Sequence, residues 1–262
     1  MSDTGPRETQ DLAKVALIGS TGRMGREVIA ALDLHPHLTL GIAFGREHLE
    51  STSLAISLLE NCDVIIDFSV VGAQTQLMKA LEQLNGKAAI PLVTGVTGLS
   101  KEHQAKLNQY SRQAPVFQAS NFSFGVALLK QLSKIAARAL GEDFDAEIYE
   151  LHHRHKMDAP SGTAISLAKA VVEGKRLAGD ERASFSQVAS TPRDQSIVQV
   201  SAGRGGGVFG DHSLLFLGEH ERIELSHSAL NRSVFASGAL RAALWCLERG
   251  PGHYGMEDLW ER

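Results

Sequence analysis

Short apolar runs alternate with amphipathic segments over the first half of the chain. Residues 14–19 form an apolar run that ends in glycine, and residues 23–34 then place Met24, Val28 and Leu32 at helical spacing. The alternation continues with predicted strands at 38–44, 63–68, 89–94 and 115–119 and predicted helices at 74–84 and 100–113. Strands that alternate with helices of ten or more residues indicate βαβ units and a doubly wound parallel sheet.

The pattern changes after residue 123. The second half contains a long amphipathic helix at 124–140, a strand of alternating polarity at 144–151 and a helix at 161–177. Strand-like runs separated by turn residues follow at 196–201, 212–218 and 222–227, and the last helix is expected at 233–247. We therefore predict an α/β chain with a Rossmann-like parallel sheet and a second α+β domain whose sheet is mixed and largely antiparallel.

The predicted domain boundaries follow from this change of pattern. Residues 1–123, together with residues 233–262, are expected to form a dinucleotide-binding Rossmann domain. Residues 124–232 are expected to form a substrate-binding domain. The last helix is assigned to the first domain because a parallel nucleotide-type sheet often needs one more covering element.

Composition narrows the classes of partner. The 262 residues carry 26 basic and 30 acidic side chains, a formal net charge of −4, so the chain lacks the basic excess that nucleic-acid binding requires. Its apolar runs are strand-length and fall well short of the ~20 residues of a membrane span. The first residues include no apolar signal segment, and Cys62 and Cys246 form no CxxC pair. We expect a cytoplasmic protein with reduced thiols that binds neither nucleic acid nor a membrane.

A glycine-rich turn follows the first predicted strand and opens the first helix. It has the spacing GxxGxxG and consists of Gly19, Ser20, Thr21, Gly22, Arg23, Met24 and Gly25. A turn with few side chains lets a pyrophosphate approach the backbone N–H groups at a helix N-terminus, where the helix dipole favours anions. The position after the first strand favours dinucleotide binding. A plain tight turn between strand and helix is the alternative.

The end of the second strand is where a Rossmann domain selects its cofactor. An acidic residue there holds the ribose of NAD, whereas an arginine accommodates the 2′-phosphate of NADP. The chain has Gly45 and Arg46 at this point, followed by Glu47. We expect NADPH or NADH as the cofactor, with NADPH slightly favoured. A solvated turn charge is the alternative interpretation of Arg46.

Two later loops follow predicted strands at what should be the same edge of the sheet. Ligands of open α/β sheets lie beyond the carboxyl ends of the strands, so these loops are candidates for the nicotinamide end of the site. Their composition is equally that of ordinary loops. The candidate residues are Gly95, Val96 and Thr97, then Ala119, Ser120, Asn121 and Phe122.

The highest density of ionisable side chains follows the strand at 144–151. Five consecutive residues can be cationic, namely His152, His153, Arg154, His155 and Lys156. Such a run is electrostatically costly unless an anion neutralises it. The turn that follows, with Ser161, Gly162 and Thr163, presents N–H groups at the start of a helix and can bind a carboxylate. Together they predict a pocket for a dianionic substrate, with a histidine as acid and a lysine as second proton donor.

Three other interpretations compete for this basic run. A zinc site is disfavoured because the stretch has no thiolate and no suitably spaced carboxylate, so no metal is expected. A Walker-type phosphate loop is excluded because no Gly-Lys-Ser/Thr follows the glycine turn. A solvated basic loop stays open as an alternative, since runs of charge commonly lie on the surface.

These stretches carry a specific resemblance. HHRHKMDAPSGTA at 152–164, with GSTGRMG at 19–25, resembles the bacterial dihydrodipicolinate reductase (4-hydroxy-tetrahydrodipicolinate reductase) family of lysine biosynthesis. Residues 203–212, 224–232 and 235–245 are also similar to the second half of that family. The resemblance therefore covers most of the chain, and the histidine and lysine string is far more specific than the glycine turn alone.

The resemblance implies a homotetrameric, two-domain oxidoreductase whose Rossmann domain binds NADH or NADPH and whose second domain also mediates oligomerisation. It implies reduction of 4-hydroxy-tetrahydrodipicolinate, the cyclic product of aspartate semialdehyde and pyruvate, to tetrahydrodipicolinate in the diaminopimelate route to lysine. By position in the motif, His152 would be the proton donor and Lys156 the second donor. His153, together with Gly162 and Thr163, would hold the substrate carboxylates.

On the cofactor side, the resemblance assigns the pyrophosphate to residues 19–24 and the adenosine ribose region to Arg46. It assigns the nicotinamide end to residues 95–97 and 119–122. The chain departs from the family at Val96, where GTTG has become GVTG, and at Gly45, where an acidic residue is common. A catalytically silent dinucleotide- or dicarboxylate-binding sensor and a different dehydrogenase on the same fold are the alternative functions.

Overall fold

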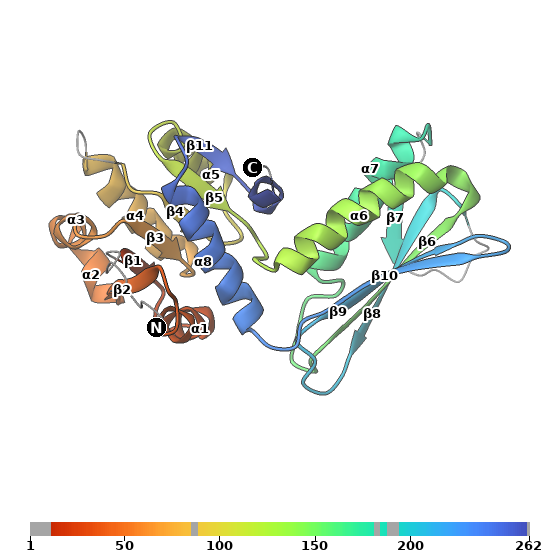
Figure 1. The fold of residues 1–262 in the computed structure, drawn as a ribbon, viewed down its shortest axis with the longest axis horizontal. Helices are drawn as coiled ribbons and strands as arrows, with labels where there is room; N and C mark the ends of the chain where they lie inside the picture. Colours follow the sequence, from red (N-terminus) through yellow and green to blue (C-terminus); the bar gives the residue numbers. More distant parts are fainter. Residues whose placement is uncertain (1–11, 85–88, 181–183, 188–193, 261–262) are drawn as a thin grey trace, which may run out of the picture. The chain divides into compact units, whose positions relative to one another are not determined.

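The computed structural model describes residues 12–84, 89–180, 184–187 and 194–260. The chain divides into two compact units (Figure 1). The first unit combines residues 1–120 with residues 235–262, and the second comprises residues 121–234. No helix among the described residues is long and apolar enough to cross a membrane.

The first unit is built around a parallel sheet of six strands. Their spatial order is β11-β5-β4-β3-β1-β2, and every neighbouring pair is parallel. The strands are β1 (Ala13–Ile18), β2 (Leu38–Phe44), β3 (Val64–Asp67), β4 (Leu92–Thr94), β5 (Pro115–Gln118) and β11 (Gly252–Tyr254). The central strand β3 is buried along its whole length, which explains why its first three residues form a continuous apolar run.

Helices connect these strands and cover the sheet, as expected for parallel neighbours that need crossover connections. They are α1 (Arg23–Leu32), α2 (Arg46–Glu50), α3 (Thr52–Leu59), α4 (Val71–Gln83), α5 (Lys101–Tyr110), α8 (Ser233–Leu247) and the 3₁₀ turn η2 (Met256–Trp260). The predicted parallel Rossmann-like sheet is confirmed. Four elements of this unit, α2, α3, β11 and η2, are absent from the sequence prediction.

The end of the chain completes the first unit. The ring of Trp245 on α8 packs edge-on against Phe117 of β5, with the two ring centroids 6.1 Å apart. Strand β11 then pairs in parallel with β5 at the edge of the sheet. Residues 235–262, which contain most of the last helix, are therefore part of the first unit. The extra edge strand was missed because it spans three residues and begins with glycine.

The carboxyl ends of five strands lie in one row. Ile18 at the end of β1 is in register with Phe44 on one side and Asp67 on the other. Asp67 is in register with Thr94, and Thr94 with Gln118. The segments that leave these residues therefore begin at a single edge of the sheet, which is where a doubly wound fold binds ligands.

The second unit is a five-stranded mixed sheet with the order β10-β9-β6-β8-β7. Its strands are β6 (Asp145–His152), β7 (Ser184–Gln187), β8 (Ile197–Arg204), β9 (Asp211–Leu217) and β10 (Arg222–Ser228). The mixed character is confirmed, but the antiparallel share is smaller than predicted, because β6, β8 and β7 are parallel neighbours. The reason is that helix α7 (Gly162–Leu177) separates β6 from β7 and β8 in the chain, and a helical crossover brings strands together in parallel.

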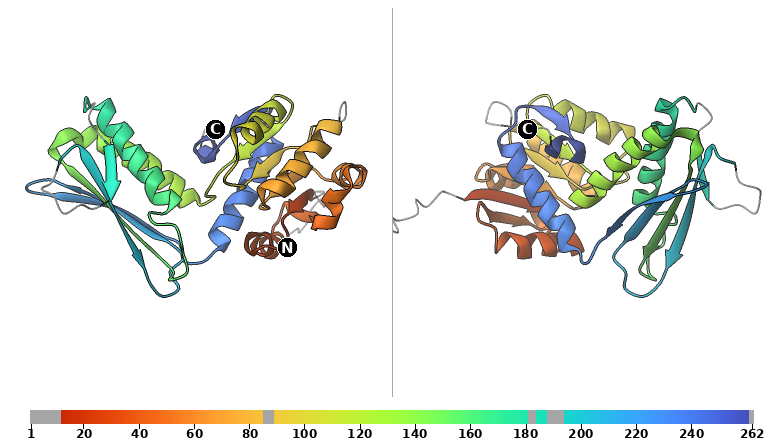
Figure 2. Two further views of the ribbon diagram at one scale, coloured as in Figure 1. Left: turned by 180° about the vertical axis from the view of Figure 1, so that it is seen from behind. Right: turned by 45° about the vertical axis from the view of Figure 1, so that its right-hand side comes forward.

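Helices α6 (Phe124–Leu140) and α7 pack on one face of this sheet (Figures 1 and 2). The alternation along β6 turns Ala146, Ile148 and His152 towards the helices, where they are buried. The odd-numbered residues of β6 point to the opposite face, where Tyr149 is 50% and Leu151 is 38% exposed. A short 3₁₀ turn, η1 (Gly141–Asp143), joins α6 to β6.

Candidate active site

The glycine turn between β1 and α1 is closed by backbone contacts that only glycine permits. Gly19 has a φ of +82°, and a Cβ there would lie 2.8 Å from the carbonyl carbon of Phe68. A Cβ on Gly25, in the first turn of α1, would lie 2.3 Å from the carbonyl oxygen of Gly19. The turn and the helix are thus in direct backbone contact, and this stretch fits the phosphate-binding turn expected from its spacing.

The start of α1 leaves its N–H groups available to an anion. The N-cap residue is Gly22, which offers no side-chain cap, and the first turn contains no acidic residue. The first N–H groups of a helix have no partner within the helix. Thr21, Gly22 and Arg23 are exposed, whereas the Ser20 hydroxyl is turned inward and donates to the carbonyl oxygen of Phe44 at 3.2 Å.

Hydrogen bonds to buried groups of the sheet anchor the loop after β4. Nε2 of Gln74 donates to Oγ1 of Thr94 at 2.7 Å, and the backbone N–H of Val96 donates to the same oxygen at 3.3 Å. The N–H of Gly95 donates to the carbonyl oxygen of Asp67 at 2.9 Å. Val96 is buried and Thr97 is exposed. The replacement of a hydroxyl residue at Val96 therefore leaves this loop anchored by its backbone.

Asp67 is fully buried beneath this edge. Burial raises the pKa of its carboxyl to about 6, although hydrogen bonds from Ser69 and Gln74 act in the opposite direction. The backbone N–H of Ser69 donates to Oδ1 of Asp67 at 2.9 Å. In the sequence, Asp67 is distinguishable only as the end of a strand, because an acidic residue at the end of an apolar run carries no sign of its burial.

Arg46 is the first residue of α2, so the predicted loop at the end of β2 is instead the start of a helix. The N–H of Gly45 donates to Nδ1 of His48 at 2.9 Å, and the His48 ring packs edge-on against Phe44. The side chain of Arg46 lies outside the described part of the structure. The preference for NADPH over NADH therefore stays a prediction.

The loop after β5 divides between the two units. The N–H of Ala119 donates to the carbonyl oxygen of Thr94 at 3.1 Å, and Ser120 is exposed. The side chain of Phe122 is buried, with 2% of the residue exposed. Asn121 belongs to the second unit, where its Nδ2 donates to Oγ1 of Thr163 at 3.0 Å. A residue predicted for the cofactor and one predicted for the substrate are thus hydrogen-bonded.

The second unit gathers a buried cluster of ionisable groups at the end of β6. Glu150 and His152 are on the same face of that strand, and Nδ1 of His152 lies 2.5 Å from Oε2 of Glu150. His212 of β9 is in register with Glu150, and its ring centroid lies 5.1 Å from that of His152. Arg204 of β8 is in register with His152.

Glu150 contacts three other residues of this region: Arg204, Ser161 and His152. Its Oε1 accepts a hydrogen bond from Nη2 of Arg204 at 3.0 Å and one from the backbone N–H of Ser161 at 3.0 Å. Burial alone would raise the pKa of this carboxyl, but the hydrogen bonds from Arg204 and Ser161 and the nearby His152 together lower it. Glu150 is therefore a buried, ionised carboxylate.

The two histidines are held in their neutral forms. Burial is the main cause that lowers the pKa of His152; the positive charges of Lys156 and Arg204 act in the same direction, and Glu150 opposes them. Burial and the neighbouring His152 lower the pKa of His212 to about 4. Dianionic substrate bound beside His152 would counter these positive charges, so the histidine would take up its proton in the complex.

The helix α7 begins with the predicted carboxylate-binding turn. Ser161 is its N-cap residue, and its Oγ accepts a hydrogen bond from the N–H of Ala164 at 3.1 Å. The same oxygen lies 3.2 Å from Nε2 of His212. Gly162 is exposed and Thr163 is half-buried, so the first turn of the helix is accessible. The helix has no acidic residue in this turn that would compete with a bound anion.

The side chains of two members of the predicted set, Lys156 and His153, have no described hydrogen bond to Glu150, His152 or His212. The Nζ atom of Lys156 is bound to Asp158, at 2.8 Å from Oδ1 and 2.9 Å from Oδ2. His153 follows the end of β6, and its ring centroid lies 6.3 Å from that of His155. Among the described contacts, none joins His153 to the turn at Ser161.

Sequence reasoning missed three residues of the cluster: Glu150, Arg204 and His212. The alternation along β6 places Glu150 on the same face as His152, so that signal was present in the sequence. Arg204 and His212 come from β8 and β9, and only the strand register brings them to the site. The zinc alternative was set aside for want of a suitable carboxylate, yet Glu150, His152 and His212 place three possible ligand atoms within 4.8 Å of one another.

The spacing of these atoms argues against a shared ion. Two ligands bound to one tetrahedral zinc at about 2.1 Å lie roughly 3.4 Å apart. Nδ1 of His152 and Oε2 of Glu150 are separated by 2.5 Å, which is shorter than this ligand-to-ligand distance. The positive guanidinium of Arg204, bonded to the other oxygen of Glu150, further disfavours a cation.

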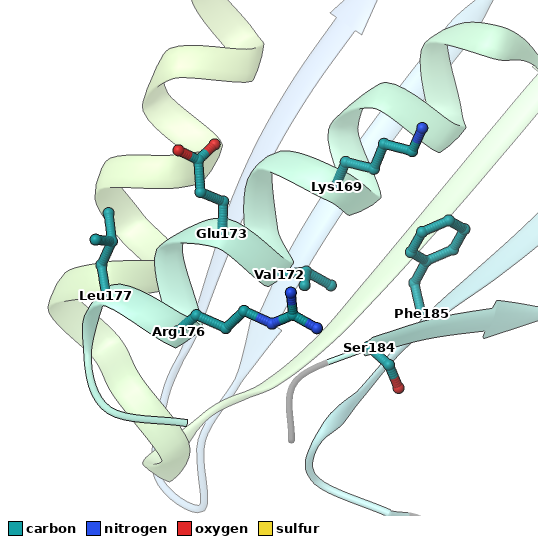
Figure 3. A pocket seen from close by; sticks show the side chains of 7 residues that line it. All are labelled: Lys169, Val172, Glu173, Arg176, Leu177, Ser184 and Phe185. Atoms are coloured by element: carbon teal, nitrogen blue, oxygen red, sulfur yellow. The ribbon is translucent and has the colours of Figure 1, made fainter. Parts of the chain in front are cut away.

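A further pocket of about 550 Å³ lies in the second unit, away from the predicted residues. Figure 3 shows its lining side chains on α7, among them Glu173 and Arg176, opposite Phe185 of β7. Glu173 is engaged by Lys134 of α6 at 2.5 Å. None of the residues predicted for cofactor or substrate lines this pocket.

Comparison with known proteins decides the family. Residues 13–122 match the N-terminal domain of dihydrodipicolinate reductase, and residues 125–260 match its C-terminal domain. The chain belongs to the dihydrodipicolinate reductase family. A 4-hydroxy-tetrahydrodipicolinate reductase from Zymomonas mobilis is 41% identical over 94% of this chain and 96% of its own length. One from Acinetobacter baumannii is 36% identical over 94% of this chain and 95% of its own length.

Solved structures agree at the level of the fold. Dipicolinate-bound dihydrodipicolinate reductase from Paenisporosarcina sp. TG-14 aligns with a TM-score of 0.72 at 22% identity, over 94% of this chain and 99% of that one. An apo scyllo-inositol dehydrogenase from Lactobacillus casei aligns with a TM-score of 0.54 at 13% identity, over 96% and 93% of the two chains. Dihydrodipicolinate reductases thus share their architecture with other dehydrogenases, so the fold alone does not select the reaction.

Proposed function

We propose that this protein reduces 4-hydroxy-tetrahydrodipicolinate to tetrahydrodipicolinate with NADPH or NADH, in the diaminopimelate route to lysine. The observation that carries the proposal is the contact of Glu150 with both His152 and the first residue of the Ser161–Thr163 turn. A proton donor and a carboxylate-binding turn are thereby held side by side in a member of this reductase family.

The first unit serves as the dinucleotide-binding domain. The reduced nicotinamide supplies the hydride, while the protein supplies orientation and electrostatic stabilisation. Residues 19–24 bind the pyrophosphate at the start of α1, a role supported by the close backbone contact at Gly19 and Gly25. Arg46 lies near the adenosine ribose, and residues 95–97 and 119–122 line the nicotinamide end. These segments all leave the same edge of the sheet.

The second unit binds the dicarboxylate and delivers the proton. His152 donates from Nε2, since its Nδ1 faces Glu150, and Lys156 acts as a second donor once its amine leaves Asp158. Ser161, Gly162 and Thr163 hold one substrate carboxylate at the N-terminus of α7. His153 assists with the negative charge. The reaction consumes one hydride and one proton and releases the 4-hydroxyl group as water.

The second unit also forms the interface of a homotetramer in this proposal. The sheet face opposite α6 and α7 carries Tyr149 and Leu151, both exposed, with the half-buried Leu215 and Leu217 on β9. Partly apolar faces of this kind are typical of association surfaces. Cys62 and Cys246 are free and buried, which supports a reducing, cytoplasmic setting.

The test is a coupled assay of nicotinamide oxidation. Substrate is generated by the synthase that condenses aspartate semialdehyde with pyruvate. Loss of nicotinamide absorbance is then followed with NADPH and, separately, with NADH. We expect oxidation that requires this protein and both precursors, and a loss of about 10²-fold or more in kcat for His152→Ala with unchanged NADPH affinity. Cofactor binding by calorimetry without any oxidation would instead identify a silent sensor.

A further inference from the structure

We propose that Glu150 is the positioning residue of this site, whose one carboxylate sets both the orientation of His152 and the position of the turn at Ser161. The proposal rests on the function proposed above, in which His152 is the acid and the turn binds a carboxylate. Glu150 itself touches neither substrate nor cofactor in this scheme, because its side chain is completely buried.

The contact with His152 fixes the tautomer of the ring. A carboxylate oxygen and an unprotonated ring nitrogen repel each other, so the 2.5 Å separation between Oε2 and Nδ1 favours the tautomer with a hydrogen on Nδ1. The other ring nitrogen is then the one left to exchange a proton with substrate. Nε2 faces the backbone of Gly210, where an added Cβ would lie only 2.9 Å away, so any larger residue at position 210 would crowd this nitrogen.

The carboxylate is itself held by two donors on its second oxygen. Nη2 of Arg204 and the N–H of Ser161 both donate to Oε1 at 3.0 Å. The Arg204 guanidinium is fixed in turn by the carbonyl oxygens of Gly203 and Asp158. Glu150 therefore cannot rotate without breaking charge-assisted hydrogen bonds in a buried site, where each such loss is costly.

The hydrogen bond from the N–H of Ser161 to Glu150 also fixes the position of the carboxylate-binding turn. Because the N–H of Ser161 is directed at Glu150, the N–H groups of Gly162 and Thr163 are the next along the chain at the helix start. Ser161 also caps α7 through its hydroxyl, which further fixes the turn. A shift of Glu150 would thus displace the acid and the carboxylate site together.

The pH dependence of the reaction reports on this arrangement. The charged or titratable groups that face His152 are Glu150 on its own strand, Arg204 on β8, His212 on β9 and Lys156 in the following loop. Only Glu150 favours the protonated form of His152. Replacement by glutamine keeps the shape but presents an amide donor to Nδ1, which opposes protonation of the ring.

The experiment compares Glu150→Gln and Glu150→Asp with the wild type. We expect Glu150→Gln to lower kcat by about 10²-fold or more, with unchanged KM for NADPH and with the basic limb of the kcat profile moved to lower pH. Glu150→Asp restores the charge, so its basic limb should return to that of the wild type even if kcat stays reduced. Glu173→Gln, on the outer part of α7, is the control. It should leave kcat and the pH of the basic limb unchanged.

A second readout does not depend on turnover. ¹⁵N NMR of histidine-labelled protein, with the His152 signals assigned through His152→Gln, distinguishes the two ring tautomers. We expect the Nδ1–H form in the wild type and the Nε2–H form in Glu150→Gln. The proposal is overturned if the tautomer and the pH profile are the same in both proteins. A wild-type protein with the expected tautomer but no turnover would defeat the proposed function and leave the positioning role standing.

Discussion

Nδ2 of Asn121 donates a 3.0 Å hydrogen bond to Oγ1 of Thr163, which joins the loop after β5 to the first turn of α7. The amide oxygen of Asn121 fixes the orientation of this side chain, because Oδ1 accepts a hydrogen bond from the backbone N–H of Ser123 at 2.8 Å. Because Oγ1 of Thr163 is the acceptor in this bond, its own O–H remains to donate to an anion. Asn121 thus acts on the proposed carboxylate site through Thr163.

Replacing Asn121 with aspartate should therefore weaken substrate binding. The new carboxylate would accept the Thr163 hydroxyl hydrogen and would repel a dianionic substrate. We expect Asn121→Asp to raise the KM for substrate by about tenfold or more, since a charge-assisted hydrogen bond contributes roughly 1.5–3 kcal/mol. Steady-state kinetics with Thr163→Val as the comparison measures this change, because that variant loses the hydroxyl without adding charge. An unchanged KM in both variants would exclude Thr163 from the carboxylate site.

The contact between Gly25 and Gly19 yields a prediction for the cofactor. A Cβ at position 25 would lie 2.3 Å from the carbonyl oxygen of Gly19, so Gly25→Ala must push α1 away from the turn. We expect a destabilisation of about 1–3 kcal/mol and a loss of NADPH affinity of about tenfold or more. Gly72→Ala is the matched control, because nothing lies within 4 Å of its Cβ and alanine favours the helix α4. Calorimetric titration with NADPH should separate the two variants, and equal affinities would show that residues 19–25 do not bind the pyrophosphate.

Substitution of Arg46 tests whether the protein binds NADPH more tightly than NADH. It begins α2 directly after β2, whose last residue is in register with Ile18 at the start of the glycine turn. Removal of an arginine that contacts the 2′-phosphate should cost roughly 1.5–3 kcal/mol, or about tenfold or more in NADPH affinity. NADH lacks that phosphate and should lose much less in Arg46→Ala. Equal losses for the two cofactors, measured by titration of the same variant, would remove the argument for a 2′-phosphate contact.

The sequence predicted most of the first unit because its signals are local. Strands β1, β4 and β5 are each followed by glycine or alanine, so the ligand-binding edge could be inferred before any register was known. Helices α2 and α3 were missed because they are five and eight residues long, too short for a helical period to stand out.

The buried cluster in the second unit could be predicted only in part. His152 was identified from its motif, and Glu150 lies two residues before it on the same face of β6. Arg204 and His212 are more than 50 residues away along the chain, and nothing local distinguishes them from surface charges. Their role depends on strand register across β8, β6 and β9, which is a property of the folded sheet. The parallel pairing of β6 with β8 does have a local signal, because helix α7 lies between the two strands in the chain.

Asp67 gives a prediction about stability and pH. Its pKa is raised by burial from an ordinary 3.8 to about 6, so between these two values the folded protein binds the proton more tightly than the unfolded chain does. This contribution to stability is complete below about pH 3.8 and is lost as the pH rises through about 6. At pH 8 the buried charge costs on the order of 3 kcal/mol relative to the protonated form, because each pKa unit corresponds to about 1.4 kcal/mol.

Asp67→Asn should remove this penalty, because the amide is neutral at every pH and can accept the N–H of Ser69 as Oδ1 does now. We expect the variant to have a thermal midpoint several degrees above that of the wild type at pH 8, with the difference shrinking as the pH falls from 7 to 5. Asp33→Asn, at the exposed end of α1, should show no such pH-dependent difference and serves as the control. A variant that is less stable than the wild type at pH 8 would mean that the Asp67 carboxylate is stabilised in its charged form at the edge where the cofactor is proposed to bind.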